Sequence, residues 1–166
     1  MKKKQESPIK KTKQSKSKKT IITIVTGTPG TGKTTVAKRI AEKQRAVYID
    51  VNEVIKHNKL KEGYDKKRKS AIIDIKKLNK VLINTIKEAK KKGISLVIDS
   101  HLSHYLPKKW VDLCIVTKTS LKKLKQRLKK RGYHKAKIQE NLECEIFDVC
   151  LEEAKDAGHK IRVVTT

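Results

Sequence analysis

The residues best suited to chemistry lie in one glycine-rich stretch, GTPGTGKT at positions 27–34. Its spacing fits G-x-x-x-x-G-K-[ST], the P-loop, which stands between a strand and a helix. The glycines let the backbone turn tightly and bring successive N–H groups onto phosphate oxygens. Lys33 supplies a positive charge for the β- and γ-phosphates, and Thr34 supplies a hydroxyl for Mg²⁺. This stretch predicts binding of a nucleoside triphosphate.

A second candidate group follows the apolar run at 94–98. Asp99 stands where the Mg²⁺-associated acid of a P-loop enzyme is expected, although such an acid can also be a helix cap or a surface residue. His101 could position a water, a phosphate or the acid, but a lone histidine is more often structural. His101 and His104 have no further ligands at suitable spacing, so we do not expect a zinc site.

A basic turn at 129–135 is a candidate lid over the phosphates. Arg127 and Arg131 are four residues apart, hence on one helical face, and arginine suits bidentate phosphate recognition. The alternative is a solvated run of charges, which is how we interpret the neighbouring lysines. Arg131, beside Gly132 and Tyr133, is the stronger candidate.

These residues need a scaffold, and the sequence alternates apolar β-branched runs with helical patterns. We expect strands at 21–25, 46–50, 94–98, 111–116 and 161–164, and helices after the P-loop and at 51–61, 70–91, 120–130 and 136–157. Helical spacing predicts two long buried faces, formed by Ile75, Leu78, Leu82, Ile86 and Ala89 and by Ile138, Leu142, Ile146, Val149 and Cys150. This alternation predicts an α/β fold with a five-stranded parallel sheet and helices on both faces.

Ligands of such sheets bind beyond the carboxyl ends of the strands. We therefore expect the P-loop, Asp50, Asp99 and His101 to meet at one edge of the sheet.

Composition limits the classes of partner and the cellular compartment that we expect. The 166 residues suit one domain, and a net charge of +26 favours an acidic partner such as nucleic acid, unless the charge only reflects a lysine-rich proteome or a thermophile's surface. Three cysteines without C-x-x-C spacing fit a reducing compartment. No 18-residue apolar run and no signal-peptide core are present, so we expect a cytoplasmic protein without a membrane span.

Residues 1–20 form a separate segment with nine lysines and one glutamate. Such a segment has too little apolar surface to order itself, so we expect a disordered basic arm before a kinase domain at 21–166. The arm contributes +8 of the net charge, which leaves +18 on the rest of the chain. The arm could hold RNA phosphates or be an uninvolved tail.

Several motifs together resemble the small adenylate kinases of the isoenzyme 6 type and their archaeal relatives. The motifs are GTPGTGKTT at 27–35, GYD at 63–65, IDSH at 98–101, LPKKWVDLCIV at 106–116, RLKKRGY at 127–133 and KIQENLECEIFDVCLEEA at 137–154. The resemblance implies a P-loop nucleoside monophosphate kinase fold with a short lid. It also implies ATP:AMP phosphotransfer with broad nucleotide use, ATP hydrolysis, and a role in small-subunit ribosome assembly through a platform ribosomal protein and rRNA.

The resemblance also assigns residues. ATP-binding positions match Gly30, Gly32, Lys33, Thr34, Thr35 and the lid residue Arg131, whereas Asp99 and His101 match the Walker-B-like pair. The NMP-binding region spans about 50–73, with Asp50, Lys56, Tyr64 and Asp65 as candidates, and the lid spans about 130–140. Lys56 stands where an arginine is expected.

Two functions from different classes stay open. One is a broad-specificity monophosphate kinase that uses ATP with Mg²⁺. The other is an ATP-hydrolysing assembly factor with little kinase activity. A P-loop kinase of another small metabolite is a third reading, supported by the P-loop alone.

Overall fold

The structure is a computed structural model that describes residues 19–66 and 70–166. The predicted basic arm lies almost wholly outside the described residues. The elements along the chain are β1 (Ile22–Thr26), α1 (Lys33–Gln44), β2 (Val47–Asp50), α2 (Val51–His57), β3 (Lys61–Asp65), β4 (Ser70–Ile73), α3 (Ile75–Lys91), β5 (Leu96–Asp99), η1 (Ser103–Tyr105), η2 (Lys108–Trp110), β6 (Leu113–Lys118), α4 (Leu121–Lys130), α5 (Lys135–Ile146), α6 (Val149–Asp156) and β7 (Ile161–Thr165).

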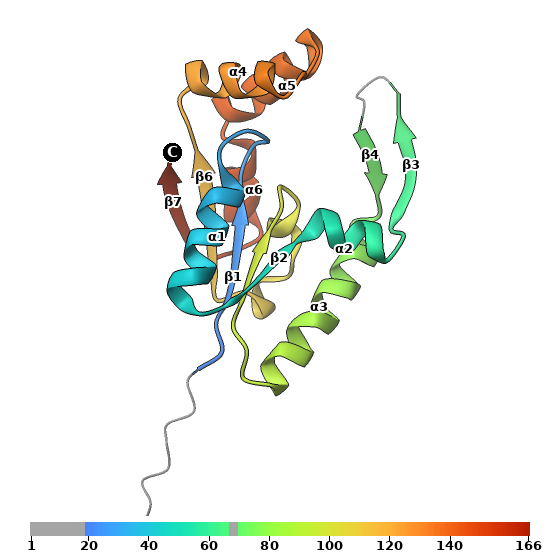
Figure 1. Ribbon diagram of the computed structural model, residues 1–166, viewed down its shortest axis with the longest axis vertical. Helices are drawn as coiled ribbons and strands as arrows, with labels where there is room; N and C mark the ends of the chain where they lie inside the picture. The colour runs from blue at the N-terminus through green and yellow to red at the C-terminus, as the bar shows by residue number, and fades with distance from the viewer. Residues whose placement is uncertain (1–18, 67–69) are drawn as a thin grey trace, which may run out of the picture.

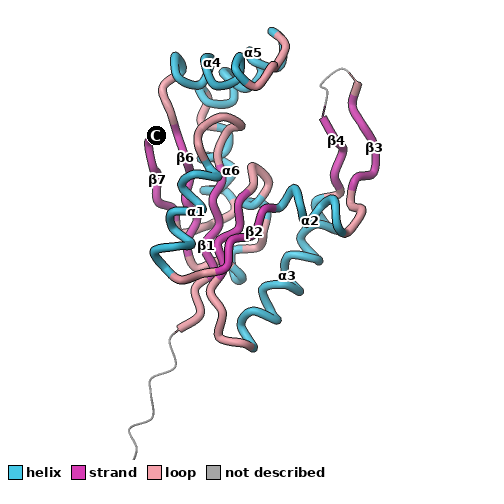
Figure 2. The backbone as a smooth tube through the Cα atoms, in the orientation of Figure 1, coloured by secondary structure: helices cyan, strands magenta, loops and turns pink. Residues whose placement is uncertain are grey.

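The central layer is a five-stranded parallel sheet in the order β2-β5-β1-β6-β7, which confirms the predicted α/β fold. Helices cover both faces of this sheet (Figure 1). The chain trace shows two parts that reach beyond the sheet: α4 and α5 at one end, and the antiparallel β3–β4 hairpin beside them (Figure 2).

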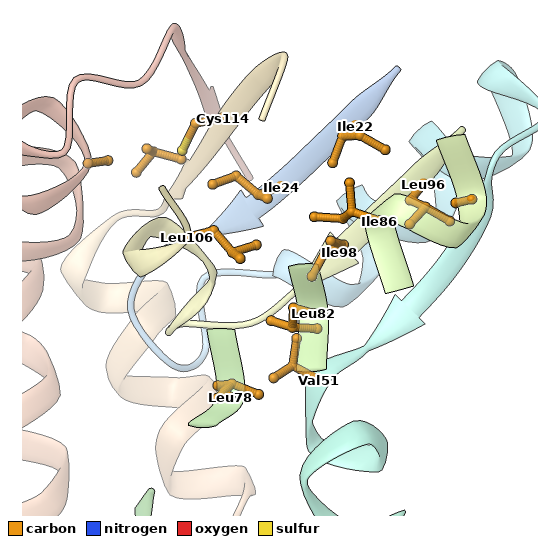
Figure 3. Close-up of a cluster of buried hydrophobic side chains, with 13 residues drawn as sticks. Ile22, Ile24, Val51, Leu78, Leu82, Ile86, Leu96, Ile98, Leu106 and Cys114 are labelled. Carbon is orange, nitrogen blue, oxygen red and sulfur yellow. The ribbon is translucent and has the colours of Figure 1, made fainter. Parts of the chain in front are cut away.

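Side chains alternate between the two faces of the sheet, as the period of a strand requires. Ile22, Ile24 and Ile98 pack on one face against Leu82 and Ile86 of α3 (Figure 3). On the other face, Val25, Val97 and Ile115 pack against Val36, Ala37 and Ala41 of α1. Burying each of these large aliphatic side chains contributes roughly 1.5–3 kcal/mol. The core is therefore centred on β1 and β5, the two strands that carry the P-loop and Asp99.

The prediction of one helix over 70–91 was wrong at its start. Ser70–Ile73 is strand β4, paired with β3, and α3 begins at Ile75. The Asp74 side chain accepts hydrogen bonds from the backbone N–H groups of Lys76 and Lys77, at 2.8 and 3.1 Å, and so caps the helix. Ile72 and Ile73 continue the apolar pattern of the helix, which hid the boundary. Of the predicted stripe, Ile75 is half-buried and the other four residues are buried, namely Leu78, Leu82, Ile86 and Ala89.

The predicted helix over 136–157 is two helices, α5 and α6. The break lies at Asp148, whose φ of 53° is left-handed and whose carboxylate pairs with Lys118 of β6. As a result Ile146, predicted to point inward, is 54% exposed. The helix predicted over 51–61 also ends early, at His57, and 61–65 is strand β3.

Among the described residues, none of the helices combines the length and apolar character needed to cross a bilayer.

The Asp74 cap gives a test of the revised helix start. Asp74→Ala should lower the free energy of unfolding by about 1 kcal/mol, because two N–H groups at the start of α3 lose their acceptor. Urea denaturation followed by circular dichroism measures it. Asp74→Asn is the control, since an amide oxygen can still cap the helix. Equal losses in both variants would show that the cap is not what stabilises this end.

Candidate active site

The P-loop connects β1 to α1 and is packed too closely to carry side chains at its glycines. Gly27 has φ 138°, and a Cβ there would lie 2.5 Å from the carbonyl oxygen of Thr117. A Cβ on Gly30, with φ 98°, would lie 2.8 Å from Leu124 of α4. Both the backbone angles and the contacts therefore require glycine. The loop is fixed against β6 on one side and α4 on the other.

Hydrogen bonds to β6 and α4 fix the conformation of the loop. The Thr31 hydroxyl lies 2.8 Å from the carbonyl oxygen of Thr28 and 2.7 Å from the Thr117 hydroxyl. The Arg127 guanidinium donates to the carbonyl of Gly30 at 3.2 Å and to the Thr166 hydroxyl at 2.9 Å. Arg127 is thus directed at the loop backbone and does not line the phosphate cleft described below. Its predicted contact with the transferred phosphates stays a prediction.

Lys33, the first residue of α1, folds back over the loop. Its ammonium donates to the carbonyls of Gly27 and Thr28, at 2.8 and 3.0 Å. Burial lowers the pKa of Lys33 to about 8, although the negative charge of Asp99 opposes that shift. The ammonium is partly desolvated, and the loop carbonyls compensate its charge only in part. An anion that binds beside it is therefore stabilised by a strong electrostatic interaction.

Asp99 ends β5 in register with Val25 of β1 and Asp50 of β2. It is only 5% exposed. One carboxylate oxygen accepts hydrogen bonds from the Thr34 hydroxyl at 2.7 Å and from the Tyr48 hydroxyl at 3.0 Å. Burial and then the hydrogen bond to Asp99 raise the pKa of Tyr48, which therefore stays a donor at neutral pH.

A hydroxyl and one carboxylate beside a phosphate-binding loop fit Mg²⁺. This ion usually takes one or two protein oxygens together with phosphate oxygens and waters. Thr34 and Asp99 would hold it, and Asp99 already lies within hydrogen-bond distance of the Thr34 hydroxyl. A bound Mg²⁺ would neutralise phosphate charge.

A cleft of about 270 Å³ opens over the loop. Its lining includes most of the residues predicted to bind ATP or to act in catalysis, namely Gly30, Gly32, Lys33, Thr34, Thr35, Asp99, His101 and Arg131. Arg131 reaches it from the C-terminal end of α4, and Tyr133 follows from the turn into α5. Figure 1 shows α4 and α5 beyond the loop at the carboxyl ends of the strands, which is where a lid must lie.

The two histidines differ in their surroundings. His104 is buried between the Thr26 hydroxyl, at 2.7 Å, and a Glu153 carboxylate oxygen, at 2.9 Å, and therefore has a structural role. His101 is exposed and lines the cleft. Desolvation by the surrounding protein lowers the pKa of His101, and the positive charge of Lys33 lowers it further. The ring is therefore neutral at pH 7.

A larger cavity of about 550 Å³ adjoins the phosphate cleft and shares Pro29, Asn52 and His101 with it. The predicted NMP-binding region contributes Ile55, Ser70, Ala71 and Ile73 to its wall. The four predicted candidates do not line it. Asp50 caps α2 by accepting from the Asn52 N–H at 2.8 Å, Lys56 and Tyr64 are exposed, and Asp65 pairs with Ser70 in the hairpin. Their contact with an acceptor nucleotide stays a prediction.

Some residues at the site were missed by sequence reasoning. Tyr48 reaches Asp99 from the middle of β2, and nothing in its local pattern separates it from a core tyrosine. Lys137, Glu140 and Glu153 line the larger cavity from α5 and α6. The KIQEN run at 137–141 was quoted only as a family motif, and its position after the lid turn was the available signal.

The low pKa of Lys33 makes phosphate binding depend on pH. Only the protonated amine attracts phosphate, so affinity for Mg²⁺–ATP should fall above pH 8, by up to roughly tenfold per unit. Calorimetric titrations between pH 7 and 9.5 measure this. Lys33→Arg is the control, because a guanidinium keeps its charge over that range. Wild-type affinity that stays constant to pH 9.5 would contradict the assignment.

Comparisons with known proteins identify the family and the fold. A family model described as an AAA domain matches residues 23–148. An "Adenylate kinase isoenzyme 6 homolog" from Caenorhabditis elegans is 36% identical over 85% of this chain and 79% of that protein. A Methanosarcina acetivorans relative is 38% identical over 85% of the chain and 75% of its own length. The crystal structure of a sugar kinase from Janibacter sp. superposes with a TM-score of 0.55 at 18% identity, over 88% of this chain and 85% of that one.

The structural match supports the fold alone, whereas the sequence matches cover most of both chains. Because relatives at 36% and 38% identity match this chain over most of its length and the family model spans residues 23–148, the chain belongs to the adenylate kinase isoenzyme 6 family of P-loop kinases.

Proposed function

We propose that this kinase transfers the γ-phosphoryl group of ATP to a nucleoside monophosphate, with AMP as one of several acceptors, and that it also hydrolyses ATP. The observation that carries the proposal is the pair of adjoining cavities, one over the P-loop and a larger one beside it, which share His101. A donor triphosphate in the first cavity and an acceptor in the second would meet at this residue.

The cavity-lining residues Lys33, Arg131 and His101 would each have a role in such a transfer. An acceptor phosphate oxygen attacks the γ-phosphorus while the bond to the β–γ bridging oxygen breaks, and two diphosphates result. Lys33 at the start of α1 and Arg131 at the end of α4 both line the cleft and compensate charge on the phosphates. Neutral His101 can hydrogen-bond to an acceptor phosphate or to a water molecule at the junction. If water takes the acceptor's place, the product is ADP and phosphate.

The test is an assay of the full chain with ATP, Mg²⁺ and each monophosphate in turn, with diphosphate and free phosphate both measured. We expect diphosphate formation that depends on the acceptor and little free phosphate when AMP is saturating. Free phosphate at the same rate with every acceptor would overturn the kinase proposal and favour the ATP-hydrolysing assembly factor.

The second proposal, a role in small-subunit assembly with a ribosomal protein and rRNA as partners, is supported by charge. The described surface carries many lysines, and the arm adds eight net positive charges. Such a surface binds nucleic acid by releasing condensed counterions. Deleting residues 1–20 should leave transfer and hydrolysis rates unchanged and flatten the salt dependence of binding to an rRNA fragment. Identical slopes would make the arm a passive tail.

Arg131 gives a prediction on catalysis. If its guanidinium clamps phosphate only when the lid closes, Arg131→Ala should lower kcat by roughly 10²- to 10³-fold and change KM for ATP much less. Steady-state kinetics with saturating AMP measure both. Arg131→Lys should recover little, since an ammonium cannot make the bidentate contact. Wild-type kcat in the alanine variant would reduce the basic turn to a solvated run of charges.

A further inference from the structure

Three lysine ammonium groups gather around one tryptophan on the surface. Lys87 and Lys90 of α3 lie 5.5 and 5.7 Å from the ring centroid of Trp110 in η2, and Lys109 lies 5.9 Å from it. These four residues are called the Trp110 patch below. The three lysines are exposed, and Trp110 is half-buried against the core.

The positive charge of the patch is not compensated by an ion pair with any described residue. Within the described parts of the chain, none of the three lysines forms an ion pair, and Glu88, which lies between two of them in sequence, pairs with Lys91 at 2.7 Å. The backbones of α3 and η2 place the three like charges near one another, and the indole face attracts each cation. A polyanion would relieve this repulsion, because several phosphates could each take one ammonium.

The patch lies far from the catalytic edge, near the start of the sheet. Asp112, two residues after Trp110, accepts from the N–H of Ile22 at 2.8 Å, and its own N–H donates to the Ile22 carbonyl at 2.9 Å. The start of β1 is therefore bonded to the segment that follows Trp110, and the sequence before β1 carries the lysine-rich segment. In Figure 1 the end of α3 and the start of β1 lie low in the view, and the lid lies at the top.

We propose that the Trp110 patch binds single-stranded nucleic acid, with one base stacked on the indole and the three ammonium groups on the flanking phosphates. An aromatic face inside a cluster of cations is the usual platform for unpaired strands, because every base has a π-face and the backbone needs only charge. The lysine side chains are long and exposed, so they can leave the ring for phosphate when a base arrives. This inference rests on the nucleic-acid partner proposed above and is independent of the kinase activity.

Trp110 is also the probe, since it is the chain's single tryptophan. The full chain is titrated with a twelve-nucleotide oligouridine, an oligothymidine of equal length, inorganic polyphosphate and polyglutamate. Both oligonucleotides should quench the fluorescence, and their ratio shows whether RNA is preferred to DNA. Polyphosphate should bind without equal quenching, because it has charge and no base.

Variants separate the patch from general charge. Lys87→Gln/Lys90→Gln removes two phosphate contacts and should lower the salt slope of oligonucleotide binding, measured by anisotropy of a labelled strand, by about 1.4. The control is Lys122→Gln/Lys125→Gln, which removes equal charge at the same spacing from exposed positions on α4. This control should retain the quenching and most of the slope. Trp110→Leu should weaken binding several-fold with an unchanged slope, and Trp110→Phe should restore most of it. Circular dichroism checks that each variant folds.

The outcomes distinguish failure of the proposed Trp110 patch from failure of the proposed nucleic-acid partner. Binding without quenching, with equal slope losses in both double-lysine variants, would overturn the patch and leave the nucleic-acid partner standing. Failure of the wild type to bind either oligonucleotide would overturn both. Equal quenching by polyglutamate would show that the patch recognises an acidic polypeptide, which overturns the inference.

Discussion

The carboxylate of Asp99 is the contact on which the site depends. It joins three elements, because β5 carries it, α1 supplies the Thr34 hydroxyl and β2 supplies the Tyr48 hydroxyl. A buried acid without such donors would cost several kcal/mol, so the two hydroxyls stabilise Asp99 in its buried position. The parallel register makes this meeting possible, since Asp50, Asp99 and the end of β1 reach the same edge together. The scaffold and the site are thus stabilised by the same hydrogen bonds.

The polar groups of the site form hydrogen bonds with one another and with the loop backbone. Lys33 bonds to loop carbonyls, Thr34 bonds to Asp99, and Arg127 holds the carbonyl of Gly30. Phosphate binding exchanges some of these bonds for stronger, charge-assisted ones, and the loop itself need not be rebuilt. The glycine contacts that fix the loop against Thr117 and Leu124 do not involve the groups that bind phosphate. A preorganised loop with exchangeable side chains is what electrostatic catalysis of phosphoryl transfer requires.

The predictable parts of the molecule were those set by local pattern. Apolar runs rich in β-branched residues located the five strands of the sheet, and the P-loop and Asp99 followed from strand ends. The β3–β4 hairpin and the break at Asp148 escaped because each depends on a partner far along the chain: a paired strand in one case and Lys118 in the other. The same reason hid Tyr48 and Glu153, whose roles come from packing. For Arg127 the local pattern was misleading. Helical spacing put it on the same face as Arg131, but packing directs Arg127 to the Gly30 carbonyl, whereas Arg131 lines the cleft.

Charge is arranged in two ways on the two ends of the sheet. At the carboxyl ends, Lys33 and Arg131 line the cleft over the P-loop, and the burial of the Lys33 ammonium strengthens its interaction with phosphate. At the opposite end, the lysines around Trp110 are exposed, so each interacts weakly and is screened by salt. A small triphosphate gains most from the first arrangement, and a long polyanion gains most from the second, through many weak contacts and released counterions. Because the sheet's core separates them, nucleotide turnover and polyanion binding can each occur without the two ligands competing for one set of cations.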